Sequence, residues 1–182
     1  MRIVAGQWRG KPLVAPKGDA TRPTADRMRE TLFNMLTSRL GSFEGLSVLD
    51  LFAGSGALGL EALSRGAAHC LFVEQDGAAL VALRQNIKSV DAHSRASVRT
   101  GSVMEVGPAQ TPADLILLDP PYGTAAGVVA LHRMLRLGWL NAATWAVLET
   151  GRKEDVAIAG LRVEAERQVG RGKLTFLRPD NI

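Results

Sequence analysis

Short apolar runs alternate along this chain with segments of helical periodicity, and this alternation restricts the possible folds most strongly. The apolar runs lie at residues 46–51, 70–74, 97–100, 114–118 and 144–149. Helical patterns separate them at residues 57–65, 77–90 and 125–137. Strands that alternate with helices usually pair in parallel, because each helix returns the chain to the same edge of the sheet. We therefore predict an α/β fold in which helices cover both faces of a parallel sheet.

The C-terminal part of the chain departs from this alternation. Residues 161–169 and residues 173–178 each alternate apolar and polar side chains, and a turn at Gly170-Arg171-Gly172 separates them. This pattern predicts two antiparallel strands joined as a hairpin. With 182 residues, of which 46% are hydrophobic, the chain can build one packed core but is short for two domains. We expect a single domain over residues 1–182.

Neither a membrane anchor nor a secretion signal is expected. The first twenty residues contain no continuous apolar segment, and no run approaches the roughly 18 apolar residues that a membrane span requires. A cytoplasmic protein is therefore expected. Cys70 is the single cysteine, which excludes an internal disulfide and a cysteine-rich zinc site. His69, His93 and His132 do not have the spacing of metal ligands, so we expect no metal site.

A glycine-rich segment follows the first apolar run. Gly54, Gly56 and Gly59 form the pattern G-x-G-x-x-G between the strand at 46–51 and the helix at 57–65. Glycines at this place permit a tight turn and let a ligand approach the backbone. Free N–H groups at the start of the following helix favour an anionic part of that ligand.

An acidic residue ends the next predicted strand. Glu74 lies twenty residues after Gly54. In a doubly wound fold, an acid at the tip of the second strand binds ribose hydroxyls. The glycines and Glu74 together predict a nucleoside site. They do not name the cofactor, because the same residues also fit a nicotinamide dinucleotide.

The tetrapeptide Asp119-Pro120-Pro121-Tyr122 follows the apolar run at 114–118. It is the segment of the chain that is most informative about the reaction. Neither proline can donate a ladder hydrogen bond, so the strand must stop there. Asp119 and the carbonyl of Pro120 can accept the two hydrogens of a planar NH2 group while Tyr122 covers its face. The alternative is a simple turn, because Asp-Pro and Pro-Pro are common turn formers.

Positive charge gathers at the N-terminal end. Residues 1–40 hold eight basic and three acidic side chains, a net charge of +5, whereas the whole chain carries +4. Such a basic segment is a candidate RNA-binding face. The alternative is the solvated side of a helix, because Met28, Leu32 and Leu36 recur at helical spacing. Trp8 can either stack on a base or pack in the protein.

These segments together resemble one known family, the bacterial small-subunit ribosomal RNA guanine-N2 methyltransferases, which use S-adenosylmethionine. The resemblance covers residues 22–36, residues 48–62, Val73-Glu74 and the tetrapeptide at 119–122. The segment that begins Arg-Pro-Thr points to this family, whereas the other motifs belong to amino-methyltransferases generally. The resemblance implies the Rossmann-like class I methyltransferase fold, with a seven-stranded, mostly parallel sheet and a C-terminal antiparallel hairpin.

The resemblance also implies the residues of the site. The catalytic residues would be Asp119, Pro120, Pro121 and Tyr122. The cofactor would be bound by Asp50, Phe52, Ala53, Gly54, Gly56, Glu74, Ser102 and Val103, and the RNA by Arg9, Lys11, Arg22, Thr24, Arg27 and Arg29. Many relatives carry an acid near the adenine amino group after the third strand. This chain has Gly101-Ser102-Val103 there, which leaves that contact to Ser102 or to the backbone.

The reaction implied is methyl transfer from S-adenosylmethionine to the exocyclic N2 of a guanine in 16S ribosomal RNA, of the guanine(966)-N2 type. The product of the cofactor is S-adenosylhomocysteine. The expected partner is ribosomal RNA, either free or within an assembling small ribosomal subunit, and the protein is expected to be a monomer without membrane contact. Residues 1–23 would form a basic N-terminal extension, with a short hairpin.

Three other functions are also compatible with parts of the sequence. An adenine-N6 methyltransferase acting on DNA or RNA fits the same tetrapeptide, because adenine also presents an NH2 group. A nicotinamide-dependent oxidoreductase explains Gly54 and Glu74 but gives Asp119 no role, and it would normally need a substrate domain. An RNA-binding module without catalysis explains the basic N-terminal end but leaves the nucleoside site unused.

Overall fold

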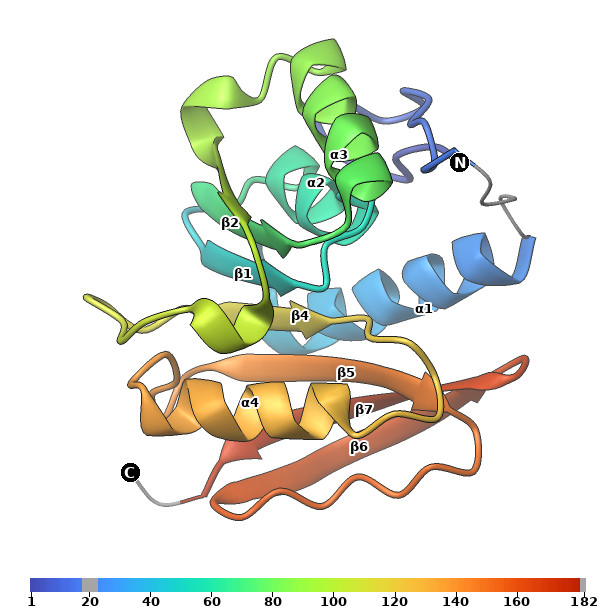
Figure 1. The fold of residues 1–182 in the computed structure, drawn as a ribbon. Helices are drawn as coiled ribbons and strands as arrows, with labels where there is room; N and C mark the ends of the chain where they lie inside the picture. Colours follow the sequence, from blue (N-terminus) through green and yellow to red (C-terminus); the bar gives the residue numbers. More distant parts are fainter. Residues whose placement is uncertain (18–22, 181–182) are drawn as a thin grey trace.

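The computed structural model describes residues 1–17 and 23–180, and it contains one sheet of seven strands (Figure 1). The strand order is β3-β2-β1-β4-β5-β7-β6. The strands are β1 (Ser47–Leu51), β2 (His69–Glu74), β3 (Ala96–Thr100), β4 (Leu115–Leu118), β5 (Trp145–Gly151), β6 (Leu161–Val169) and β7 (Gly172–Pro179). Strands β1 to β5 pair in parallel, whereas β7 is antiparallel to β5 and to β6. The predicted mostly parallel sheet with a C-terminal hairpin is confirmed.

One helix precedes β1, and three more connect parallel strands of the sheet. They are α1 (Pro23–Leu40), α2 (Ala57–Ser64), α3 (Gly77–Ser89) and α4 (Ala126–Arg136), with single 3₁₀ turns at η1 (His93–Arg95) and η2 (Val103–Glu105). The predicted strands and helices agree with the observed ones to within two residues at each end. The agreement follows from periodicity, because a buried parallel strand is apolar on both faces and a surface helix on one.

Two apolar clusters cover the two faces of the sheet. On one face, α1, α2 and α3 supply residues such as Phe33, Leu60 and Leu83, which pack against strand residues such as Phe72. On the other face, α4 buries Leu131 among its neighbours. Figure 1 shows α4 in front of β5 and α1 behind the sheet. The prediction that helices cover both faces is confirmed.

Helix α1 is amphipathic. Met28, Leu32 and Leu36 are buried at a spacing of four residues, whereas Arg27 and Glu30 are exposed. Residues four apart lie on one face of a helix, so this face packs on the sheet and the charged face meets solvent. The solvated helix face is confirmed, and RNA contact by its exposed basic side chains stays a prediction.

The N-terminal segment folds back on itself and then packs on α2. Arg2 and Pro12 form an antiparallel bridge, and the N–H of Ile3 donates to the carbonyl of Lys11 at 3.0 Å. The fully buried carboxylate of Glu61 in α2 accepts hydrogen bonds from the N–H groups of Val4 and Ala5, at 2.8 and 3.0 Å. A buried carboxylate with such partners fixes the segment in place.

Trp8 belongs to this packing. Its side chain is 7% exposed, and the guanidinium of Arg95 lies 5.3 Å from its ring. The N–H of Trp8 donates to the hydroxyl of Ser64 at 2.9 Å. Of the two interpretations of Trp8, the structure supports packing, because a buried ring covered by a guanidinium cannot stack on a base.

The described residues contain neither a membrane-spanning helix nor a cluster of metal ligands. Within residues 1–17 and 23–180, no helix is long and apolar enough to cross a membrane. The same residues contain no group of three His, Cys, Asp or Glu side chains arranged to hold a metal ion.

Candidate active site

The largest cavity described lies at the carboxyl ends of the central parallel strands and has a volume of about 1260 Å³. Its wall contains Gly54 after β1, Glu74 at the end of β2, the tetrapeptide at 119–122 after β4, and Glu149 in β5. Ligands of open α/β sheets bind at this edge, where the strand order reverses. Single ligand pockets usually measure about 300 to 1000 Å³, so this cavity can hold a nucleoside cofactor and a base together. The structure thus brings the two predicted motifs into one cavity.

The three glycines of the loop have three different reasons to be glycine. Gly54 has a φ of +58° and open space on the side where a Cβ atom would lie, so a ligand can reach its backbone. Gly56 has a φ of +86°, and a side chain there would collide with that of Leu83. At Gly59 a Cβ atom would lie 2.4 Å from the ring of Phe72, so only glycine lets α2 approach β2 this closely.

Phe52 and Ala53 connect β1 to the glycine loop and line the cavity. Phe52 has a φ of +57°, in the left-handed region where a bulky residue is rarely found. Such a conformation costs about 1 to 3 kcal/mol and occurs mostly at functional sites. The next residue is anchored, because the N–H of Ala53 donates to the carbonyl of Val73 at 3.0 Å.

Glu74 is held by the backbone on both carboxylate oxygens. Its Oε1 accepts from the N–H of Gly54 at 2.8 Å, and its Oε2 accepts from the N–H groups of Gln75 and Asp76 at 2.9 and 2.8 Å. An ionised carboxylate has about four acceptor positions. About one acceptor position therefore remains for a hydroxyl group of a ligand in the cavity.

Asp50 lies beneath the glycine loop and not in the cavity wall. It is 1% exposed, and its Oδ2 accepts from the N–H of Gly59 at 3.0 Å. Its Oδ1 is buried without a hydrogen-bond partner among the described residues. Burial, followed by the nearby charges of Asp119 and Glu74, raises the pKa of Asp50 well above its usual range. The geometry gives Asp50 a role in holding the loop.

Ser102 and Val103 also lie outside the wall of this cavity. The hydroxyl of Ser102 accepts from the N–H of Met104 at 3.1 Å, which caps η2. Val103 is buried in the apolar cluster on the α4 face of the sheet. Their segment still adjoins the site, because the N–H of Gly101 donates to the carbonyl of Glu74 at 2.9 Å.

Asp119 and Glu149 lie side by side because their strands are in register. Leu118 of β4 pairs with Leu148 of β5, and each acid follows its leucine. Asp119 opens onto the cavity, and the hydroxyl of Tyr122 donates to Oε2 of Glu149 at 3.2 Å. Glu149 is the main residue of the site that we did not predict from the sequence.

Burial shifts the protonation of these groups. It raises the pKa of Asp119, although the side chain opens onto the cavity, because protein surrounds it on its other sides. Burial also raises the pKa of Glu149, and the neighbouring Asp119 raises it further. Burial and the charge of Glu149 raise the pKa of Tyr122. Two adjacent carboxyl groups of this kind retain one proton between them near neutral pH.

The tip of the β6–β7 hairpin forms another part of the wall. A Cβ atom at Gly172 would lie 2.4 Å from the Tyr122 hydroxyl oxygen and 2.4 Å from the methyl carbon of Met28. Met1 and Pro16 of the N-terminal segment line the same cavity. We did not predict any of these contacts, because they join segments that are far apart in the sequence.

The six residues predicted to bind RNA divide into three groups. Arg9, Lys11 and Arg27 are exposed. Arg29 is 5% exposed and donates to the carbonyl of Arg2 at 2.6 Å, with Asp26 and Glu61 as ionic partners. This guanidinium holds the N-terminal segment in place and also lines the large cavity, and RNA contact by Arg29 stays a prediction. Arg22 and the side chain of Thr24 lie outside the described residues.

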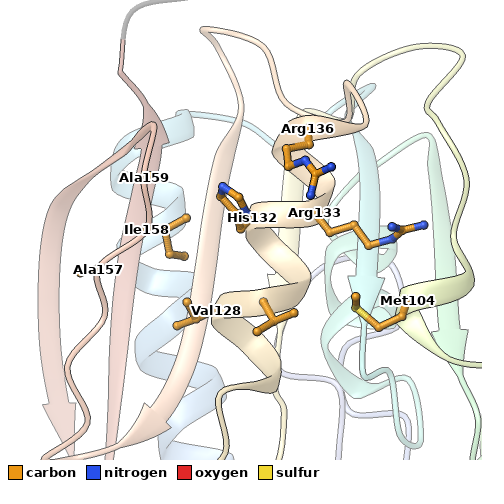
Figure 2. Close-up of a pocket in the computed structure, with 9 residues that line it drawn as sticks. Met104, Val128, His132, Arg133, Arg136, Ala157, Ile158 and Ala159 are labelled. Carbon is orange, nitrogen blue, oxygen red and sulfur yellow. The ribbon is translucent and has the colours of Figure 1, made fainter.

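A second cavity lies on the α4 side of the sheet and is shown in Figure 2. It measures about 350 Å³ and lies between α4, which supplies His132, Arg133 and Arg136, and the segment that contains Ile158. Its wall contains none of the residues predicted for the site. The larger cavity is therefore the candidate active site.

Comparison with known proteins places the chain in a family. The family model described as "Conserved hypothetical protein 95" matches residues 1–178. The "Ribosomal RNA small subunit methyltransferase D" of Escherichia coli K12 is 39% identical over 140 residues, which cover 77% of this chain and 69% of that protein. The "Putative rRNA methyltransferase YlbH" of Bacillus subtilis is 40% identical over 126 residues, which cover 67% of each.

Solved structures agree with this assignment. The putative methyltransferase yhhF from Escherichia coli has a TM-score of 0.85 and 33% identity, and the match covers 100% of this chain and 99% of that one. The putative methylase HI0767 from Haemophilus influenzae has a TM-score of 0.81 and 29% identity over 98% and 97% of the two chains. The predicted class I methyltransferase fold is confirmed. The chain therefore belongs to the Conserved hypothetical protein 95 family, that of the small-subunit ribosomal RNA methyltransferases D.

Proposed function

We propose that this protein is an S-adenosylmethionine-dependent methyltransferase that modifies the exocyclic N2 of a guanine in small-subunit ribosomal RNA. The observation that carries the proposal is the single cavity whose wall contains both the glycine loop with Glu74 and the tetrapeptide at 119–122. An oxidoreductase would leave the tetrapeptide without a role, and a binding module would leave the nucleoside site unused. The names of the relatives, ribosomal RNA methyltransferases, favour the same substrate class.

The residues present fit S-adenosylmethionine. The carboxylate of Glu74 is oriented by three backbone N–H groups and keeps about one acceptor position for a ribose hydroxyl. Gly54 leaves its backbone open to the ligand, and Phe52 and Ala53 supply apolar wall beside it. The proposal includes Asp50 and Gly56 as residues that shape the loop. Ser102 and Val103 would act through their backbone, because their side chains are engaged elsewhere.

When bound, S-adenosylmethionine supplies an electrophilic methyl group and leaves as the neutral thioether S-adenosylhomocysteine. The lone pair of the guanine amino group is delocalised into the ring. Hydrogen bonds from this amino group to Asp119 and to the carbonyl of Pro120 localise the lone pair as charge develops. Pro121 restricts the backbone that presents these acceptors, and Tyr122 covers the face of the base.

Orientation is the larger contribution of the site. Holding the amino group in line can supply about 7 to 11 kcal/mol, whereas a general base contributes only about 10²- to 10⁴-fold in rate. Asp119 therefore acts mainly as an acceptor that positions the amino group. As the bond from nitrogen to the methyl carbon forms and the bond to sulfur breaks, the amino group loses one proton, which Asp119 takes up. The cavity wall around it is formed by Tyr122 and Gly172, which fix the space for the base.

The target base must leave its stack to enter this cavity, and this costs least for an unpaired loop nucleotide. Arg9, Lys11 and Arg27 are exposed and can contact phosphates outside the cavity. The continuous sheet supports the proposal that residues 1–182 form one domain. A single domain with one such cavity needs no second copy to complete it, which favours a monomer.

The test is methylation of small-subunit ribosomal RNA by the purified protein with labelled S-adenosylmethionine, followed by mass analysis of the nucleosides. We expect N2-methylguanosine at one position. N6-methyladenosine in its place would support the adenine-N6 alternative. Calorimetric binding of NAD without binding of S-adenosylmethionine would overturn the proposal.

A further inference from the structure

Glu149 is an acid of the cavity to which the proposed reaction gives no role. It lies in β5 beside Asp119, and the hydroxyl of Tyr122 donates to it at 3.2 Å. Neither Asp119 nor Glu149 takes part in an ion pair among the described residues. Two adjacent acids without a basic partner in the protein form a site that favours hydrogen-bond donors of a ligand.

The strand order places the residues of the site along one edge of the sheet. The order β2-β1-β4-β5 gives, in turn, Glu74, the glycine loop, Asp119 and Glu149. The nucleoside end of the cavity is therefore at β1 and β2, and Asp119 comes next. Glu149 lies one strand farther from the nucleoside end than the acceptor of the reacting amino group.

The bases differ at the atom that would face this position. In guanine, the ring N1 beside the amino group carries a hydrogen and is a donor. In adenine, the ring N1 beside the amino group is an acceptor. We propose that Glu149 is a specificity-determining residue that accepts the N1–H of the target guanine while Asp119 accepts from its amino group. This inference rests on the proposed function and deepens it, because it explains the choice of guanine over adenine.

The protonation of the pair agrees with this role. Burial and the neighbouring Asp119 raise the pKa of Glu149 to about 9, which favours a neutral Glu149 at pH 7 whose proton can face Asp119. The remaining lone pairs are acceptors, and the hydroxyl of Tyr122 keeps the Glu149 side chain oriented. If a base presents an acceptor at N1, this nitrogen and the facing oxygen of Glu149 both lack a hydrogen-bond partner. Sites built to bond a particular donor reject analogues without it by up to about 10⁴- to 10⁵-fold.

The experiment uses short RNAs that span the guanine mapped by the methylation test above. One RNA carries guanine at the target position, and the other carries 2-aminopurine, which keeps the 2-amino group but has an acceptor at N1. We expect the wild-type protein to prefer guanine by at least about 100-fold in kcat/KM. The variant Glu149→Ala removes the acceptor for N1–H, so the preference should narrow by at least about tenfold.

Glu164→Ala is the matched control, because Glu164 is an exposed acid on β6 paired with Arg162 at 2.6 Å. This control should keep the wild-type preference. A wild-type protein that methylates 2-aminopurine as fast as guanine would overturn the role of Glu149, whatever the variant does. An unchanged preference in folded Glu149→Ala would also overturn it and leave the proposed function intact. Failure of the wild-type protein to methylate guanine would overturn both.

Discussion

The two halves of the cavity satisfy their polar groups in opposite ways. On the β1–β2 side, the carboxylate of Glu74 is held by three backbone N–H groups before any ligand binds. On the β4–β5 side, Asp119 and Glu149 are adjacent, and neither forms an ion pair among the described residues. Burial raises the pKa of both. Acceptors that are already oriented increase the affinity of a binding site. In a catalytic site, acceptors that are unpaired until the substrate binds can stabilise the transition state.

The largest effect that would test this contrast is expected at Asp119. The variant Asp119→Asn exchanges a carboxylate for a weaker, neutral acceptor and presents an NH2 that opposes the guanine amino group. We expect the rate of single-turnover methyl transfer to fall by at least tenfold, toward about 10²-fold. S-adenosylmethionine affinity should change little. A wild-type rate in this variant would show that the tetrapeptide only forms a turn and that Asp119 has no catalytic role.

On the other half of the cavity, Glu74→Ala should act on binding. Removing the ribose acceptor should weaken S-adenosylmethionine binding by about 1.5 to 3 kcal/mol, which is the contribution of hydrogen bonds to a charged group. Calorimetric titration measures this change, and circular dichroism checks the fold. Glu164→Ala is a suitable control, because Glu164 is an exposed acid on β6 that does not line the cavity. Equal affinity in folded Glu74→Ala would exclude Glu74 from the nucleoside site.

A smaller effect is expected outside the cavity, at the exposed basic residues. Replacing Arg9, Lys11 and Arg27 with Gln should reduce RNA affinity and flatten its salt dependence. Each lost phosphate contact should lower the slope of log K against log salt by about 0.7 to 0.9. Cofactor affinity should remain at the wild-type value. A slope equal to that of the wild type would show that these side chains do not contact RNA phosphates.

The smallest effect concerns stability and pH. Glu149 has a pKa raised by burial to about 9 in the folded state, whereas about 4.3 is usual in an unfolded chain. The folded protein therefore binds more protons than the unfolded chain between these values, and its stability falls as pH rises through this range. Glu149→Gln removes this penalty. We expect the variant to melt a few degrees above the wild type at pH 8.

This thermal advantage should disappear near pH 4, where the carboxyl group is protonated in both the folded and the unfolded state. Thermal melts of both proteins across this pH range measure the difference. An advantage that does not depend on pH would show that packing, and not protonation, separates the two proteins. Melts of Glu149→Ala under the same conditions establish that the variant of the specificity assay is folded.

The sequence by itself determined the elements of the fold and the two motifs of the site. Strand and helix ends agree with the structure to within two residues because periodicity and Pro or Gly punctuation are local properties. Glu74 and Asp119 were found in the same way, since each ends an apolar strand. The resemblance to a known family then supplied what the glycine motif left open, the cofactor.

Only the tertiary structure decided which distant residues complete the cavity and which predicted residues leave it. Glu149 ends an apolar run too, so the sequence carried a signal for it. Its place beside Asp119 depends on the pairing of β4 with β5. Ser102 and Val103 were predicted beside the cofactor but do not line the cavity, whereas Arg29 is buried against Arg2 and Glu61 in the cavity wall. Strand register and burial arise from contacts between distant segments, and no local pattern encodes them.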